Sequence, residues 1–124
     1  MKLGKNIPLP EKPSKDILDT FPNPGVTQVT FKTKEFTSLC PITGQPDWVD
    51  VEINYRPEKV CIESKSLKLY LQSYRNEKGF IEELATRIAK DLTTVLNTYV
   101  AVWLTSTPRG GVSITALSDG QEDK

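Results

Sequence analysis

The chain has 124 residues, of which sixteen are acidic, sixteen are basic and none is histidine. This length suits one domain with a modest core, and the balanced charge disfavours a general nucleic-acid-binding protein, which would carry a basic excess. The sequence contains no apolar run long enough to span a bilayer, and its N-terminus lacks the apolar stretch of a secretory signal. We therefore expect a cytoplasmic protein that does not contact a membrane.

The N-terminal half predicts an arm followed by strands. Residues 1–25 are rich in proline and lysine and show no period, which is typical of an extended arm, and the apolar residues 17–21 could dock on a neighbouring molecule. Residues 26–36 predict a strand. Apolar and polar residues alternate over 49–55, which predicts a second, half-buried strand, and residues 59–62 begin another extended piece.

Two helices follow these strands. The first begins near Ser64, with Ser64 and Ser66 as candidate caps, and residues 76–79 break it. The second is the clearest element of the chain, because its apolar residues share one helical face. That face consists of Phe80, Ile81, Leu84, Ala85, Ile88, Leu92, Val95 and Leu96.

The C-terminal part predicts two more strands, over 99–106 and 111–117, joined by a hairpin loop over 107–111. Residues 118–124 are polar and predict a frayed tail. Strands on both sides of a helical pair indicate an α+β fold, in which an antiparallel sheet carries both helices on one face. We expect one domain over residues 26–117.

The two cysteines have different surroundings. Cys61 lies in an apolar run and is predicted to be an inert buried thiol. Cys40 lies between a strand and a turn rich in proline and glycine, where its side chain can face a cleft. Two thiols without histidine make a poor zinc site, and a cytosolic chain is not expected to form a structural disulfide. We therefore expect no metal site.

The segment over 36–47 offers a thiol, Cys40, and a carboxyl group, Asp47, on either side of a turn. Since the chain lacks histidine, activation of the thiol must come from a carboxylate, a lysine or arginine, the backbone or the substrate. A charged carboxylate would raise the pKa of a thiol, so Asp47 suits the role of a proton donor better than that of an activator. The alternative is that Cys40 fills space and Asp47 caps the turn.

Three further positions carry charges that could bind a ligand. Lys65 and Lys68 lie three residues apart near a helix N-terminus and could grip phosphates, or they could form an ordinary solvated face. Arg109, in a loop flanked by glycine, could reach a phosphate or simply be exposed on a hairpin. Glu82, at the start of the second helix, gains from the helix dipole and could pair with the donor edge of a guanine-like base.

Taken together, four segments make a specific pattern. Residues 36–47, 63–70, 73–76 and 107–111 occur in an order and spacing that resemble the 7-cyano-7-deazaguanine reductases, the nitrile reductases of queuosine biosynthesis, in their short single-domain form. The resemblance implies a catalytic domain with the tunnelling fold (T-fold). It also implies a homo-oligomer whose subunits pool their sheets into a ring, pentameric and in some cases stacked as a decamer, with active sites between subunits.

The resemblance also implies a reaction and a set of site residues. The nitrile of a small molecule, 7-cyano-7-deazaguanine, is reduced to an aminomethyl group by two NADPH, without direct contact to a nucleic acid. The sulfur of Cys40 adds to the nitrile carbon to form a thioimide, and Asp47 protonates the nitrile nitrogen. The implied substrate-binding residues are Ile62, Glu63, Ser64, Ile81 and Glu82, and the implied NADPH-binding residues are Lys65, Lys68 and Arg109.

One position departs from the family pattern. The family carries a His-Glu pair where this chain has Ile81 and Glu82. Isoleucine packs but cannot move a proton, so we expect slower turnover with substrate binding retained. Two alternatives to the reductase stay open. One is an amidinotransferase-like relative that uses ammonia, although such relatives generally lack the Glu-Ser-Lys-Ser-x-Lys segment kept here at 63–68. The other is a substrate-binding protein whose catalysis has lapsed.

Overall fold

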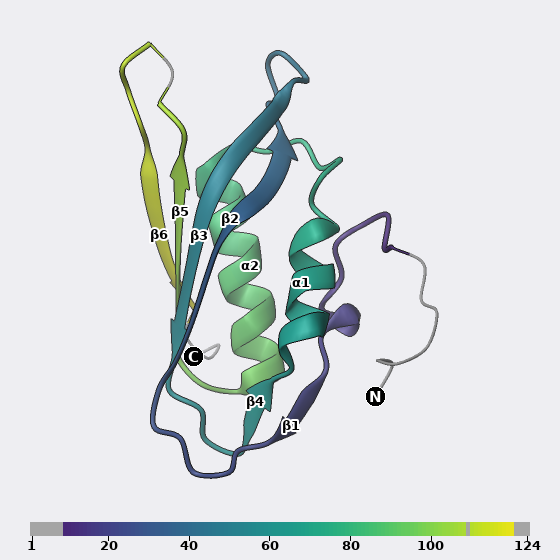
Figure 1. The fold of residues 1–124 in the computed structure, drawn as a ribbon, viewed down its shortest axis with the longest axis vertical. Coiled ribbons are helices and arrows are strands. Elements are labelled where there is room, and N and C mark those ends of the chain that lie inside the picture. Colours follow the sequence, from purple (N-terminus) through teal and green to yellow (C-terminus); the bar gives the residue numbers. More distant parts are fainter. Residues whose placement is uncertain (1–8, 109, 121–124) are drawn as a thin grey trace.

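The computed structural model describes residues 9–108 and 110–120, and its centre is a four-stranded antiparallel sheet with two helices on one face (Figure 1). The sheet order is β2-β3-β5-β6. This arrangement confirms the predicted α+β class. The elements are β2 (Val29–Leu39), β3 (Pro46–Tyr55), α1 (Ser64–Gln72), α2 (Ile81–Leu96), β5 (Val100–Ser106) and β6 (Thr115–Gly120).

Strand β3 shows the period of two that the sequence predicts. On the face toward the helices its side chains are fully buried, whereas Trp48 and Asp50 on the opposite face are exposed. Alternate residues of a strand point to opposite faces, so the apolar set meets the helices and closes the core. The buried set is Val49, Val51, Ile53 and Tyr55.

Helix α2 presents the predicted apolar face to the sheet, with Leu84, Ile88 and Leu92 at most 1% exposed. The prediction was wrong at Phe80, which is 51% exposed. Phe80 is the N-cap residue, and its extended backbone (φ −71°, ψ 151°) places it outside the helical period. The helix ends at Asn97, whose φ of 53° is the left-handed conformation common at helix C-termini.

The first described residues pack on the chain itself. A 3₁₀ turn, η1 (Lys15–Ile17), precedes β1 (Thr20–Pro22), which pairs antiparallel with β4 (Val60–Ile62). Leu18 between them is only 8% exposed and belongs to the core. The sequence predicts an extended arm over 1–25, but an apolar residue can be buried by its own chain as readily as by a neighbour.

The last strand lies further along the chain than the sequence predicts. Gly110 and Gly111 have positive φ values of 59° and 79°, so the chain is still turning where a strand was expected. Residues 118–120, assigned to the tail, instead belong to β6 and pair with β5. Gly120 lies so close to α2 that a Cβ there would come within 1.9 Å of the Thr93 hydroxyl oxygen. Residues 121–124 lie outside the described part of the chain.

None of the helices within residues 9–108 and 110–120 is both long enough and apolar enough to cross a membrane.

Candidate active site

A tight turn between β2 and β3 brings the thiol and the acid to one end of the sheet. The amide of Cys40 donates to the Gln45 carbonyl at 2.8 Å, and the amide of Gly44 donates to the Cys40 carbonyl at 2.8 Å. Gly44 has a φ of 71°, which a glycine adopts without strain. Just before the turn, Ser38 pairs with Asp47 across the two strands. The turn therefore brings Cys40 and Asp47 to the same end of the sheet, close enough for the charge of Asp47 to act on the thiol.

The turn itself lowers the pKa of the Cys40 thiol. The first cause is a hydrogen bond from the Thr43 hydroxyl, followed by backbone hydrogen bonds from Thr43 and Ile42. Asp47 acts in the opposite direction, as expected for a nearby carboxylate, but more weakly. The largest contribution therefore comes from a side-chain hydroxyl, which was not among the sources of activation that the sequence left open, and the backbone, which was among them, adds to it. Cys40 is half-exposed and free, whereas Cys61 is buried, as predicted.

Thr43 is the residue that lowers the pKa of Cys40 most, and the sequence prediction did not single it out. Its hydroxyl oxygen accepts a hydrogen bond from the amide of Gln45 at 3.2 Å, so the hydroxyl hydrogen remains for the sulfur of Cys40. Threonine often bonds to the backbone two residues away in turns. The position of Thr43 three residues after Cys40 was the available signal.

Replacing Thr43 with valine should slow reaction of Cys40 with iodoacetamide. Valine keeps the shape but removes the hydrogen bond that favours the thiolate, so the pKa of Cys40 should rise and the thiolate fraction at neutral pH should fall. Alkylation rates measured from pH 6 to pH 10 should show a midpoint displaced upward, with a loss of roughly threefold to tenfold at neutral pH. A Thr43→Ser variant, which retains a hydroxyl, is the matched control. An unchanged pH profile in Thr43→Val would exclude this role.

Asp47 lies on the helix side of β3. It is half-buried and directly opposite Ser38, which is 1% exposed, while its neighbour Trp48 faces the other side and is 55% exposed. An acid in this position lies at the same end of the sheet as the sulfur of Cys40 and within electrostatic reach of it. The arrangement suits proton donation to a group that the thiolate attacks.

Two backbone hydrogen bonds tie the start of α2 to this turn. The amide of Leu39 donates to the Glu77 carbonyl at 2.8 Å, and the amide of Gly79 donates to the Leu39 carbonyl at 3.3 Å. Leu39 precedes Cys40, and Gly79 lies two residues before Ile81. Ile81 is 8% exposed and packs in the core, while Glu82 is exposed in the first turn of α2. Four candidate residues thus gather at this end.

The other candidates lie where β4 leads into α1. Ile62 is buried, and its amide donates to the Tyr55 hydroxyl at 3.0 Å. The carboxylate of Glu63 caps α1 by accepting from the amides of Lys65 at 3.0 Å and Ser66 at 2.8 Å. The predicted serine caps were wrong: Ser64 is exposed and the helix already has its cap.

Ser66 has a different role from the cap that the sequence predicts. It is 1% exposed, and its hydroxyl accepts from the amide of Asp19 at 2.9 Å and donates to the Glu63 carbonyl at 2.7 Å. It therefore joins α1 to the segment between η1 and β1. A local pattern could not predict this, because Asp19 is far away in the sequence.

Lys65 and Lys68 are both exposed on α1. Lys68 and Ser64 line a cavity of about 170 Å³ between α1 and β2, together with apolar side chains such as Phe31. Typical ligand pockets measure roughly 300–1,000 Å³, so this cavity of a single chain is too small for a dinucleotide. The third predicted cofactor residue, Arg109, lies outside the described residues.

The candidates therefore form two groups at opposite ends of α1. The β2–β3 turn and the start of α2 lie at one end in Figure 1, and β4 with the start of α1 lies at the other. Helix α1 has nine residues, which corresponds to about 13 Å of helix. A single chain does not bring the thiol and the Glu63–Lys68 segment together.

Comparison with known protein families shows to which family the chain belongs. The family model described as QueF-like protein matches residues 46–124. The chain belongs to the QueF-like family. A relative from Streptococcus thermophilus strain LMD-9, named NADPH-dependent 7-cyano-7-deazaguanine reductase, is 48% identical over 115 residues, covering 90% of this chain and 71% of the relative.

Two further QueF-like relatives carry the same name. The protein from Zymomonas mobilis strain ZM4 is 44% identical over 119 residues, which cover 90% of this chain and 79% of the relative. The protein from Bacillus subtilis strain 168 is 48% identical over 103 residues, covering 80% of this chain and 62% of the relative. These alignments confirm the resemblance found in the sequence.

A solved structure also matches the QueF-like fold. The crystal structure of the archaeosine synthase QueF-Like in the apo form superposes with a TM-score of 0.72 at 27% identity, covering 77% of this chain and 94% of that chain. The QueF-like proteins have the T-fold, and the antiparallel sheet with two helices described above is its single-subunit form.

Proposed function

We propose that this chain is an NADPH-dependent 7-cyano-7-deazaguanine reductase of queuosine biosynthesis. The observation that carries the proposal is the turn that lowers the pKa of Cys40 within electrostatic reach of Asp47, in a chain 44–55% identical to reductases of that name. A thiol prepared for attack and a neighbouring acid are the two groups that addition to a nitrile requires.

The first step follows from these two residues. The Cys40 thiolate adds to the nitrile carbon, a carbon–sulfur bond forms, and one π bond of the nitrile breaks. The nitrile nitrogen gains that electron pair and takes the proton of Asp47, which gives a neutral thioimide. The chemistry that NADPH supplies is hydride transfer, and the four-electron reduction of a nitrile to an amine consumes two molecules. A thiol of lowered pKa is also a good leaving group when the carbon–sulfur bond breaks.

The residues proposed for NADPH are Lys65 and Lys68, with Arg109 as a third. Both lysines are exposed cations next to the start of α1, which fits the phosphates of a dinucleotide. The helix amides of Lys65 and Ser66 already bond to Glu63, so the lysine side chains would provide the phosphate contacts.

A homo-oligomer with sites between subunits is part of the proposal. Within one chain the Cys40 group and the Glu63–Lys68 group stand apart, so a second copy would have to bring its α1 to the first copy's thiol. The outer edges of the sheet leave room for such pairing, since β6 pairs only with β5 among the described residues. We propose a pentameric ring, with a stacked decamer as a variant. In it, Ile62, Glu63, Ser64, Ile81 and Glu82 bind the base.

We also propose a cytoplasmic location. Both cysteines are free thiols, which suits a reducing compartment, and NADPH would be available there.

The test is an assay of NADPH oxidation with 7-cyano-7-deazaguanine. We expect oxidation only when the nitrile is present, with two NADPH consumed for each aminomethyl product identified by mass spectrometry. Reactions lacking the nitrile give the background rate. The proposal is wrong if the nitrile produces neither NADPH oxidation nor an adduct on Cys40.

A second function is favoured by one observation, the structural match to an archaeosine synthase at a TM-score of 0.72. A relative of that kind would let ammonia displace the thiolate of the same thioimide and release an amidine. Incubation with ammonia in place of NADPH distinguishes the two. Amidine formed with ammonia, and no amine formed with NADPH, would replace the first proposal with this one.

Restoring histidine at position 81 should raise turnover. Ile81 is 8% exposed at the start of α2 and cannot move a proton, and general acid–base assistance typically contributes about a hundredfold or more in rate. We expect Ile81→His to increase kcat at least about tenfold with little change in KM. Ile81→Gln, which is polar but does not titrate in this range, is the control. Equal rates in all three proteins would show that position 81 does not limit catalysis.

A further inference from the structure

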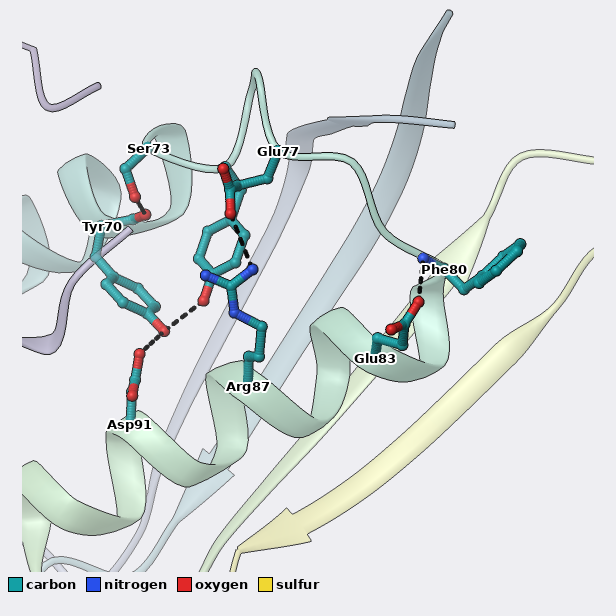
Figure 2. A network of polar contacts seen from close by, with 8 residues as sticks. Tyr70, Ser73, Glu77, Phe80, Glu83, Arg87 and Asp91 are labelled. Carbon is teal, nitrogen blue, oxygen red and sulfur yellow. Dashed lines mark hydrogen bonds and ion pairs between the residues drawn. The ribbon is translucent and has the colours of Figure 1, made fainter. Parts of the chain in front are cut away.

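A cluster of polar side chains lies between α1, α2 and the segment that connects them (Figure 2). The hydroxyls of Tyr70 and Tyr74 are 2.7 Å apart, and Tyr70 donates to Asp91 Oδ2 at 2.7 Å. Both tyrosines are 0% exposed. The guanidinium of Arg87 lies over the Tyr74 ring, 5.3 Å from its centroid. None of these residues belongs to the candidate site described above.

The hydrogen bonds of this cluster have a fixed direction. Burial raises the pKa of Tyr74 to about 12 and raises that of Tyr70 further, so both hydroxyls stay protonated. The single hydrogen of Tyr70 goes to Asp91, so the contact between the tyrosines requires Tyr74 to donate to Tyr70. The ring of Tyr74 is therefore held in one position, and the guanidinium of Arg87 packs on its face.

Arg87 connects the tyrosine cluster to the segment between α1 and α2. Its Nη1 forms an ion pair with Glu77 Oε1 at 3.0 Å, as Figure 2 shows. The backbone carbonyl of the same Glu77 accepts the amide of Leu39, the residue before Cys40. Two residues further on, the amide of Gly79 donates back to Leu39. The end of β2 thus rests on a segment that Arg87 holds against α2.

The start of α2 is fixed by the same segment. The amide of Phe80 donates to Glu83 Oε1 at 3.1 Å, which closes the first turn of the helix (Figure 2). Only Phe80 separates Gly79 from Ile81, so the segment touches the thiol turn on one side and the base-recognition residues Ile81 and Glu82 on the other.

We propose that Arg87 and Glu77 are positioning residues for Cys40, whose ion pair sets the distance between the thiol turn and the start of α2. The inference rests on the proposed function, because that function makes Cys40 the reacting thiol and Glu82 a group that holds the base. Nucleophilic attack requires the reacting atoms to meet within a narrow range of distance, so a displacement of the turn slows the reaction without changing the thiol itself.

The experiment compares four variants with the wild-type chain. Arg87→Met and Glu77→Gln each remove the ion pair while keeping much of the side-chain shape. Arg87→Lys keeps the charge for Glu77 and for the Tyr74 ring, and serves as the conservative rescue. Glu52→Gln removes the ion pair between Lys32 and Glu52, which are 3.9 Å apart on the sheet, and serves as the control.

Amide hydrogen exchange tests directly whether the Arg87–Glu77 ion pair protects the backbone hydrogen bonds of Leu39 and Gly79. We expect exchange at Leu39 and Gly79 to accelerate about threefold to fivefold in Arg87→Met and Glu77→Gln, to recover in Arg87→Lys and to stay unchanged in Glu52→Gln. Exchange at Val102 and Leu104, both fully buried in β5, should not change. Acceleration of equal size in β5 would mean that the pair only stabilises the whole fold, and would overturn the inference.

A second readout separates position from intrinsic reactivity. In Arg87→Met, formation of the Cys40 adduct with the nitrile should slow by a similar factor, whereas alkylation of Cys40 by iodoacetamide should not. An unchanged rate of nitrile addition overturns the inference. If the wild-type chain forms no nitrile adduct at all, the proposed function fails, and the exchange at Leu39 and Gly79 still decides whether Arg87 and Glu77 hold the turn.

Discussion

Replacing Cys40 with alanine is expected to abolish the covalent nitrile adduct and to reduce NADPH oxidation below about a thousandth of the wild-type rate. The lowered pKa of this thiol and its half-exposed position make it the available nucleophile, since Cys61 is 4% exposed and the chain contains no histidine. Intact-protein mass spectrometry detects the adduct, and NADPH absorbance reports turnover.

Cys61→Ala is the matched control. The thiol of Cys61 lies 3.7 Å from the Asn23 side-chain oxygen, in a part of the structure away from the β2–β3 turn. This variant should keep both the adduct and turnover, with only a modest loss of stability from the truncated buried side chain. An adduct that maps to Cys61 would show that Cys40 is not the nucleophile. Turnover that survives in Cys40→Ala would show that a thioimide on Cys40 is not required.

Replacing Asp47 with asparagine should affect two reactions of the same thiol in opposite directions. Addition to the nitrile should slow by about a hundredfold to ten-thousandfold, because asparagine keeps the shape of the acid but has no proton to give to the nitrile nitrogen. Alkylation of Cys40 by iodoacetamide needs no acid. Since the charge of Asp47 raises the pKa of Cys40, its removal should lower that pKa further and leave alkylation equal or faster at neutral pH.

This pair of measurements distinguishes an acid from a structural residue. If Asp47 only held the turn, the variant would disturb the Thr43 and Ile42 hydrogen bonds to the sulfur, and both reactions would slow together. Asp50→Asn, which lies on the exposed face of the same strand, gives the effect of removing a charge from β3. Slowing of both reactions by similar factors would rule out the proton-donor role.

The sequence predicted those parts of the fold that depend on local patterns. The alternation over β3 and the apolar face of α2 are both found in the structure, because each period reports which residues of one element face the core. Cys40 and Asp47 could be paired as candidates from the sequence for a related reason. They lie on one short segment, so a turn between two strands was sufficient to bring them together.

Features that depend on distant segments could not be predicted in this way. The bonds of Leu39 to Glu77 and Gly79 join residues some forty positions apart, and no local pattern marks them. The extension of β6 to Gly120 brings that residue against Thr93 on α2, a packing contact between distant segments. The separation of the thiol from the Glu63–Lys68 segment likewise appears only once α1 lies between them.

Glu63 caps α1, and under the proposed function it would also bind the base. Each carboxylate oxygen offers two lone pairs, and α1 uses one on each for the amides of Lys65 and Ser66. Two lone pairs remain for N–H donors of a guanine-like base. A base bound there would be held by the same two atoms that start the helix, so ligand binding would suppress fraying of the first turn of α1. Loss of the Glu63 carboxylate would then weaken both binding of the base and the first turn of α1.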